Sequence, residues 1–211
     1  MEKQNNLKCA LLSSIVNLND VIHQEIKDQV TLKSKIIYLV GKKASTDIYY
    51  KEACTFYNHM GASSVEYFNL EEKENDQLID AIKSCDILHL GGGNTFEFSR
   101  LMIEGNYFDI FKEILPKVKL IVGVSAGAII QTNDLQIASF LDEDNTNIET
   151  VGLGIYELSC LPHFNTIDQQ TLIEVKTYTK HIDNKIFGIN DGGGILIYSD
   201  NHLEVFDTVI I

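Results

Sequence analysis

The chain has 211 residues, a hydrophobic content of 45% and a formal net charge of -13 at pH 7. This acidic surface repels phosphate backbones and anionic lipids, which argues against nucleic-acid and membrane partners. No apolar run reaches the roughly 18 residues that a membrane-spanning helix needs. The four cysteines form no CxxC pair and the N-terminal residues form no signal peptide, so we expect free thiols and a cytoplasmic location.

Short apolar runs, several of them rich in Ile and Val, recur along the chain and predict buried strands. Several are apolar on both faces, which favours a mostly parallel sheet between layers of helices. The predicted strands are Cys9–Ile15, Ile36–Val40, Val65–Leu70, Ile87–Leu90, Leu120–Val124, Glu157–Leu161, Ile186–Ile189, Ile195–Tyr198 and Leu203–Ile211.

The segments between these runs carry apolar residues at helical spacing. The predicted helices are Asp20–Gln29, Ser45–Gly61, Gln77–Ser84, Asn94–Met102 and Tyr107–Ile114. Alternation of strands and helices predicts a doubly wound α/β fold. Because the sequence has no linker and no internal repeat, we expect one domain over residues 1–211. The acidic stretch 142–145 is typical of a solvated loop.

The strongest motif is Gly-x-Ser-x-Gly at Gly123 to Gly127, between an apolar strand and a small-residue helix start. This context is that of a nucleophile elbow, in which a sharp turn presents the serine at a helix N-terminus. The motif therefore predicts Ser125 as a catalytic nucleophile. The alternative is a tight packing turn in which a serine is merely small.

A second glycine-rich loop, Gly91-Gly92-Gly93-Asn94, follows the strand at Ile87–Leu90. It matches neither a P-loop nor a GxGxxG motif, but free N–H groups in such a loop can bind an anion. Beside a serine nucleophile, we expect an oxyanion hole formed by the N–H groups of Gly92 and Ala126. Gly93 is a neighbouring candidate, and Gly93 and Asn94 are expected to bind substrate. A glycine turn needed only for packing is the alternative.

A serine nucleophile needs a base and a carboxylate that orients it. His163 follows a strand-like run, where doubly wound sheets place reactive groups. His89 has apolar neighbours and is expected to be packed in the core. Asp191 precedes a glycine turn at a strand end and is the favoured acid, with Asp134 as its rival and a plain turn residue as the alternative. The resulting order of Ser, His and Asp differs from that of α/β-hydrolases.

At these motifs, together with Thr132-Asn133-Asp134 and Pro162-His163-Phe164, the chain resembles the dipeptidase E family of serine peptidases, peptidase family S51. The resemblance implies a flavodoxin-like fold, similar to class I glutamine amidotransferases, with helices on both faces of the sheet. It also implies Ser125 as nucleophile, His163 as base, and no metal or organic cofactor.

The chain departs from this family at two places. Asp191 stands where dipeptidase E proteins usually have Glu, which predicts a Ser-His-Asp version of the triad. The family reads an N-terminal Asp with an arginine after the catalytic histidine, whereas Asn165–Lys185 contains no arginine and Arg100 is the only one in the chain. Lys176, Lys180 and protonated His181 are the cations of that region, and lysine lacks the bidentate fork of arginine.

We therefore expect a serine exopeptidase that cleaves dipeptides or short peptides, those with N-terminal Asp among them, through an acyl-enzyme. Its partner would be a small peptide, and it would be a monomer or a small homo-oligomer. Two alternatives are a hydrolase of another amide or ester, such as a cyanophycinase-like enzyme, and a catalytically silent binding module on the same fold. An amidotransferase would have Cys, rather than Ser, at position 125.

Overall fold

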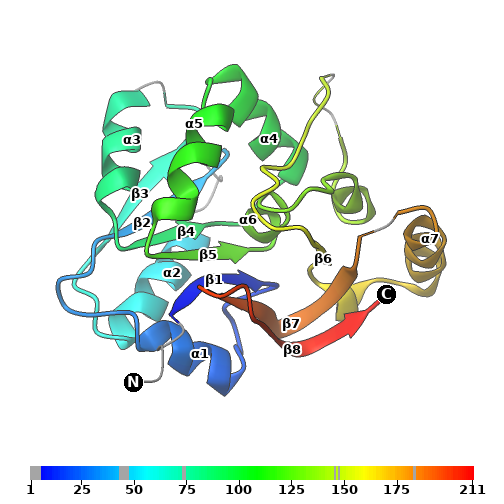
Figure 1. The fold of residues 1–211 in the computed structure, drawn as a ribbon, viewed down its shortest axis with the longest axis horizontal. Coiled ribbons are helices and arrows are strands. Elements are labelled where there is room, and N and C mark those ends of the chain that lie inside the picture. The colour runs from blue at the N-terminus through cyan, green and yellow to red at the C-terminus, as the bar shows by residue number, and fades with distance from the viewer. Residues whose placement is uncertain (1–5, 43–47, 73–74, 145, 147, 183) are drawn as a thin grey trace.

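The computed structural model describes residues 6–42, 48–72, 75–144, 146, 148–182 and 184–211. Strands and helices alternate over most of this length, as Figure 1 shows. The strands are β1 (Leu7–Leu12), β2 (Ile36–Val40), β3 (Val65–Asn69), β4 (Ile87–Leu90), β5 (Leu120–Val124), β6 (Ser159–Leu161), β7 (Ile186–Tyr198) and β8 (Leu203–Ile210). The α-helices are α1 (Asp20–Lys27), α2 (Ile48–His59), α3 (Asn75–Ser84), α4 (Thr95–Glu104), α5 (Phe108–Ile114), α6 (Ala126–Ile129) and α7 (Gln169–Thr179).

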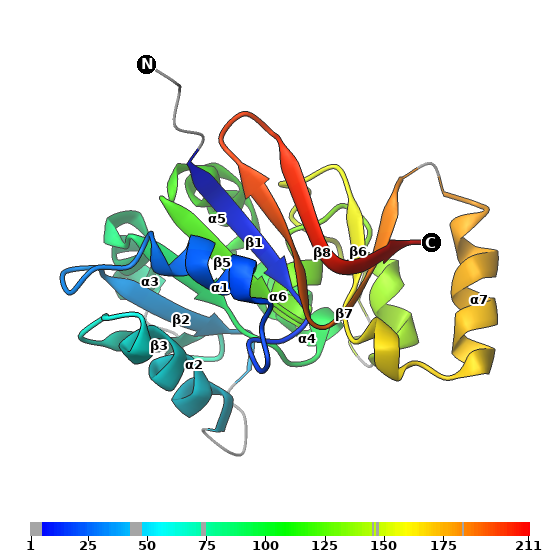
Figure 2. The ribbon, with the colours of Figure 1, turned by 90° about the horizontal axis from the view of Figure 1, so that it is seen from below.

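The strands form one mixed sheet in the order β3-β2-β4-β5-β1-β7-β6, with β8 paired to β7. The strands from β3 to β1 in this order are mutually parallel, whereas β7 runs antiparallel to both β1 and β8. The fold is therefore the mostly parallel α/β sheet that the sequence predicts. In Figures 1 and 2, α7 lies at the opposite end of the molecule from β3.

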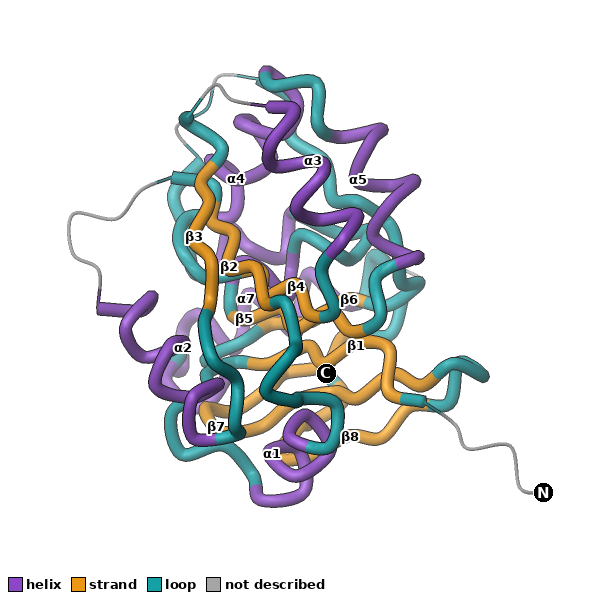
Figure 3. The backbone as a smooth tube through the Cα atoms, turned by 90° about the vertical axis from the view of Figure 1, so that its left-hand side faces the viewer, coloured by secondary structure: helices purple, strands orange, loops and turns teal. Residues whose placement is uncertain are grey.

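Both faces of the sheet are buried, because successive side chains on the strands point to opposite sides. On β1, Cys9 and Leu11 join one hydrophobic cluster, and Ala10 and Leu12 join the other. The first cluster is covered by α3, α4, α5, α6 and α7, and the second by α1 and α2. Figure 3 shows the strands between α1 and α2 on one side and α3, α4 and α5 on the other. The predicted helical layers on both faces are therefore present.

The region before the C-terminus differs from its prediction. The glycine turn expected after Ile189 is wrong, because β7 continues through Asp191 and the glycines to Tyr198. Pairing with β8 shifts between Ile189 and Gly194, so β7 bulges there, and Gly192 takes a positive φ of 85°. Within the bulge, the carbonyl groups of Gly192 and Gly193 accept hydrogen bonds from the N–H groups of Asn19 and Ser13, and paired strand structure resumes at Gly194.

Other differences concern helices. The helix α7 is not among the predicted ones, although Asp168 caps its start by accepting a hydrogen bond from the N–H of Thr171. The predicted helix Ser45–Gly61 corresponds to α2, and residues 45–47 lie outside the described residues, as does Asn145 of the acidic stretch. None of the described helices combines the length and apolar character needed to cross a membrane.

Candidate active site

Ser125 lies in a strained turn between β5 and α6. Its backbone has φ 53° and ψ -117°, and its N–H donates to the carbonyl of Leu12 at the end of β1. The turn packs without room for side chains at its glycines: a Cβ on Gly127 would lie 2.0 Å from the carbonyl oxygen of Leu90, and one on Gly123 would lie 2.4 Å from that of Gly127. A non-glycine residue at φ near 50° is costly, so the surroundings must hold this serine in place. This geometry is that of a nucleophile elbow.

The side chains of Ser125, His163 and Asp191 form a hydrogen-bonded chain. The Nε2 atom of His163 lies 3.0 Å from the Oγ atom of Ser125, and its Nδ1 atom lies 2.7 Å from the Oδ1 atom of Asp191. His163 follows β6 and also has a left-handed backbone, with φ 56°. The three residues expected from the sequence thus come together from three different elements. Asp191 lies in the bulge of β7, and its carboxylate is within hydrogen-bond distance of the imidazole.

Two residues that the sequence did not point to form hydrogen bonds that position His163 and Asp191. Ser13, directly after β1, donates from Oγ to Asp191 Oδ1 at 2.6 Å and accepts from the N–H of His163 at 2.8 Å. Asn165 accepts from the N–H of Asp191 at 2.8 Å. The same Oγ atom lies 3.3 Å from Nδ1 of His163, and Ser13 is 1% exposed, so its hydroxyl is removed from water and is surrounded by these three groups. It therefore ties the acid and the base of the site to the end of the central strand.

The rival acid Asp134 lies elsewhere. Its Oδ1 atom accepts a hydrogen bond from the hydroxyl of Tyr178 on α7 at 2.7 Å. This contact, together with the negative charge and the burial of the phenol, keeps Tyr178 protonated, because burial first and Asp134 second raise its pKa. The structure brings Asp191, and not Asp134, to His163.

The glycine-rich loop after β4 runs beside Ser125. A Cβ on Gly92 would lie 3.4 Å from the Cβ of Ser125, and Gly93 has a φ of 135°. Within the described residues, no backbone hydrogen bond is donated by the N–H groups of Gly92 and Ala126, which lie beside Ser125 in the loop and at the start of α6. Asn94 is not brought into the site, because its side chain caps α4 by accepting from the N–H of Glu97 and donating to the carbonyl of Glu143.

A cavity of about 430 Å³ opens onto Ser125 and His163, and we call it the catalytic cavity. It lies where β1, β4 and β5 end, which is the edge at which doubly wound sheets bind ligands. His89 lies in its wall and is buried as expected, with Nδ1 at 3.0 Å from the hydroxyl of Tyr57. Burial lowers the pKa of His89 to about 3, so this ring stays neutral. The remaining wall includes Ser13, Ser14, Ile15, Val16, Tyr38, Tyr49, Glu52, Gly92, Gly93 and Val124.

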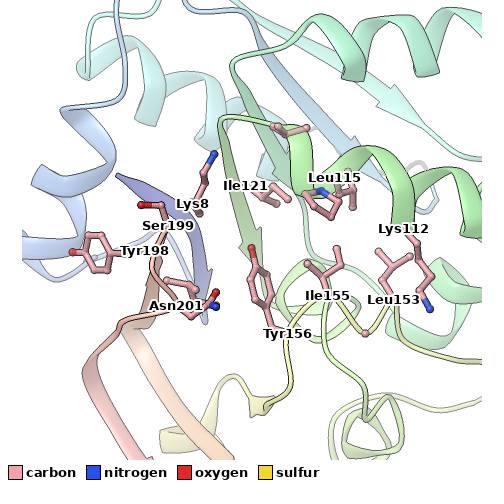
Figure 4. A pocket seen from close by; sticks show the side chains of 14 residues that line it. Lys8, Lys112, Leu115, Ile121, Leu153, Ile155, Tyr156, Tyr198, Ser199 and Asn201 are labelled. Atoms are coloured by element: carbon pink, nitrogen blue, oxygen red, sulfur yellow. The ribbon is translucent and has the colours of Figure 1, made fainter. Parts of the chain in front are cut away.

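A second cavity, of about 420 Å³, shares no lining residue with the first (Figure 4). It is lined by Lys8 near the start of β1, Ile121 near the start of β5, Lys112 and Tyr156. It therefore lies away from the edge where Ser125 and His163 meet. Among the residues that the structure describes, no group of three His, Cys, Asp or Glu side chains is placed to hold a metal ion.

The cations considered for binding a substrate carboxylate do not line the catalytic cavity. Arg100 pairs with Glu97 at 2.6 Å and with Glu104, and these two carboxylates raise its pKa further. Lys176 and Lys180 lie at the end of α7, where both are exposed. The only arginine of the chain is thus already neutralised by its neighbours.

The contacts of Ser13 predict its importance for turnover. Ser13→Ala removes the hydroxyl that binds both Asp191 and the backbone of His163, so kcat should fall about 10- to 100-fold while KM changes little. Steady-state kinetics check this. The matched control is Ser14→Ala, because Ser14 also lines the cavity but, within the part of the chain that the structure describes, its hydroxyl accepts from the N–H of Val16 and contacts neither Asp191 nor His163. Equal losses in both variants would assign Ser13 no special role.

Comparisons with known proteins show the family of the chain. The model of peptidase family S51 matches residues 10–205. An uncharacterized peptidase of Listeria monocytogenes is 24% identical over 165 residues, covering 74% of this chain and 76% of its own. An uncharacterized peptidase of Listeria innocua is 25% identical over 160 residues, covering 69% of this chain and 75% of its own.

Solved structures share the fold. A Listeria monocytogenes protein provisionally assigned as peptidase E superposes with a TM-score of 0.76 at 20% identity, over 97% of this chain and 99% of that one. A peptidase from an acI-B1 Actinobacterium gives a TM-score of 0.63 at 15% identity, over 97% and 89% of the two chains. With the family model matching nearly the whole chain, the protein belongs to peptidase family S51 and is a serine peptidase.

Proposed function

We propose that this protein is a serine exopeptidase that hydrolyses dipeptides or short peptides through an acyl-enzyme on Ser125. The observation that carries the proposal is the unbroken chain from Ser125 Oγ through His163 to Asp191, with distances of 3.0 Å and 2.7 Å. These distances suit proton transfer from the serine and fixation of the imidazole tautomer. Ser125 and His163 line a cavity whose volume is within the range of small-ligand sites.

In the proposed mechanism, His163 Nε2 takes the proton of Ser125 as Oγ attacks the scissile carbonyl carbon. The negative charge on the carbonyl oxygen is stabilised by the N–H groups of Gly92 and Ala126. His163 then gives its proton to the leaving amine, and the amide C–N bond breaks. Water attacks the acyl-enzyme with His163 again as base, which releases the acid product and restores Ser125. Each oxyanion donor is expected to lower the barrier by about 3–4 kcal/mol.

Aspartyl specificity stays a prediction from the family resemblance. The described residues that line the catalytic cavity include no lysine or arginine to bind the side chain of an N-terminal Asp. Cleavage of peptides with other N-terminal residues is therefore the part of the proposal that the cavity supports better.

The test is to label the protein with a neutral fluorophosphonate probe and to locate the adduct by mass spectrometry, alongside hydrolysis of chromogenic amides with different N-terminal residues. We expect an adduct on Ser125 and cleavage of the amides. Labelling with cleavage confined to esters or other amides would favour a cyanophycinase-like hydrolase. A protein that is neither labelled nor active would be a binding module, and the proposal would fall.

A further inference from the structure

Among the described residues that line the catalytic cavity, one has an acidic side chain. Glu52 lies in its wall, and among the described lining residues there is no lysine or arginine. On the same helix, Lys51 lines an adjoining cavity of about 370 Å³, which Glu52 also lines and whose lining does not include Ser125. A substrate bound at Ser125 therefore faces a negatively charged side chain in the described wall of the cavity.

Glu52 reaches this position because of how α2 packs. Ala53 and Tyr57 bury one side of the helix against the sheet, which leaves Glu52 half-buried on the side that faces the cavity. Its carboxylate lies close enough to the ring of Tyr38 on β2 to contribute, after burial and Tyr67, to the raised pKa of that phenol. No described residue forms an ion pair with Glu52.

The surroundings of Glu52 suit a cation in two further ways. Tyr49 places an exposed aromatic ring in the same wall, and the face of such a ring attracts a positive charge. Since no described residue forms an ion pair with the Glu52 carboxylate, an ammonium group can donate charge-assisted hydrogen bonds to it without displacing another cation. An incoming carboxylate, in contrast, would meet repulsion.

We infer that Glu52 is a specificity-determining residue that binds a protonated amine of the substrate, within the catalytic cavity beside Ser125. The amine is either the free α-amine of the N-terminal residue or the ammonium of a basic side chain, since both present the same chemistry. The inference rests on the proposed function, because it places that amine on a substrate whose carbonyl is attacked by Ser125. The preferred substrates are then peptides with a neutral or basic N-terminal residue.

The test compares Glu52→Gln with the wild type on leucyl and lysyl p-nitroanilides, each with a free and an acetylated α-amine. Glu52→Gln keeps the shape of the side chain and removes its charge. We expect kcat/KM to fall about 10- to 100-fold on substrates that carry the recognised amine, mainly through KM. A loss that follows the free α-amine identifies that source, and a loss that follows the lysyl side chain identifies the other.

Two controls separate this inference from the proposed function. Glu66→Gln removes the same charge from β3, outside the cavity, and should leave kinetics unchanged. The rate at which a neutral fluorophosphonate labels Ser125 should also be unchanged in Glu52→Gln. If labelling and hydrolysis fall together in Glu52→Gln, or if hydrolysis of free-amine substrates does not fall, the role assigned to Glu52 is wrong. If the wild type is not labelled at Ser125, the proposed function itself fails.

Discussion

Ser125→Ala and His163→Ala should each lower kcat about a million-fold, and the double variant should be no slower than either one. The reason is that the hydroxyl and the imidazole act as one unit, joined by the 3.0 Å contact between Oγ and Nε2. Once one member is gone, the other has no proton to take or to give. Steady-state hydrolysis of the best amide substrate measures all three variants.

The kcat values of the variants can be compared with that of the wild type only if each variant folds. Ser125 has a positive φ that alanine tolerates no better than serine, so thermal unfolding should be measured for each variant beside its activity. Residual activity in Ser125→Ala close to that of the wild type would place the nucleophile elsewhere. Losses that multiply in the double variant would show that the two side chains act independently.

Asp191→Asn should lower kcat about ten-thousand-fold with little change in fold. The carboxylate lies 2.7 Å from Nδ1 of His163, where it fixes the tautomer that leaves Nε2 free to accept the proton of Ser125. An amide at this position can donate to Nδ1 instead, which moves the ring proton to Nε2 and blocks its function as a base. Kinetics on the same amide substrate measure the loss.

Asp134→Asn is the matched control for this loss. Asp134 is the other aspartate that the sequence offers for the role, and its described partner is the hydroxyl of Tyr178. We expect its substitution to affect stability through that hydrogen bond and to leave turnover nearly unchanged. A larger loss of activity in Asp134→Asn than in Asp191→Asn would reverse the assignment of the acid.

The sheet was largely predictable because its strands are buried on both faces. β2, β4 and β5 span the same residues as the apolar runs that predicted them. The prediction failed in β7, where glycines usually mark a turn but here form a bulge within one strand that pairs with β8 on either side of it and with β1 from Gly194 onward. Such pairing depends on strands distant in the chain, so a local pattern could not reveal it.

The site residues also divide into those with a local sequence motif, which were predicted, and those placed by contacts between distant segments, which were not. Ser125, His163 and Asp191 each lie in or beside an apolar strand with a local motif, so their positions could be read from the sequence. Ser13 has no motif of its own, and its role arises only because β1 lies next to β7, which carries the residue 178 positions away. Glu52 lies within an ordinary helical pattern, and only the packing of α2 against the sheet places it in the wall of the catalytic cavity.

The position of β7 late in the chain also has a consequence for biosynthesis. The ribosome makes Ser125 38 residues before His163, and His163 28 residues before Asp191. A nascent chain that has emerged only as far as α6 carries a serine with neither base nor acid, and an unassisted hydroxyl is a weak nucleophile. If Ser125, His163 and Asp191 act together as proposed, full activity requires β7 to have inserted beside β1, and the nascent chain should be a poor hydrolase until then.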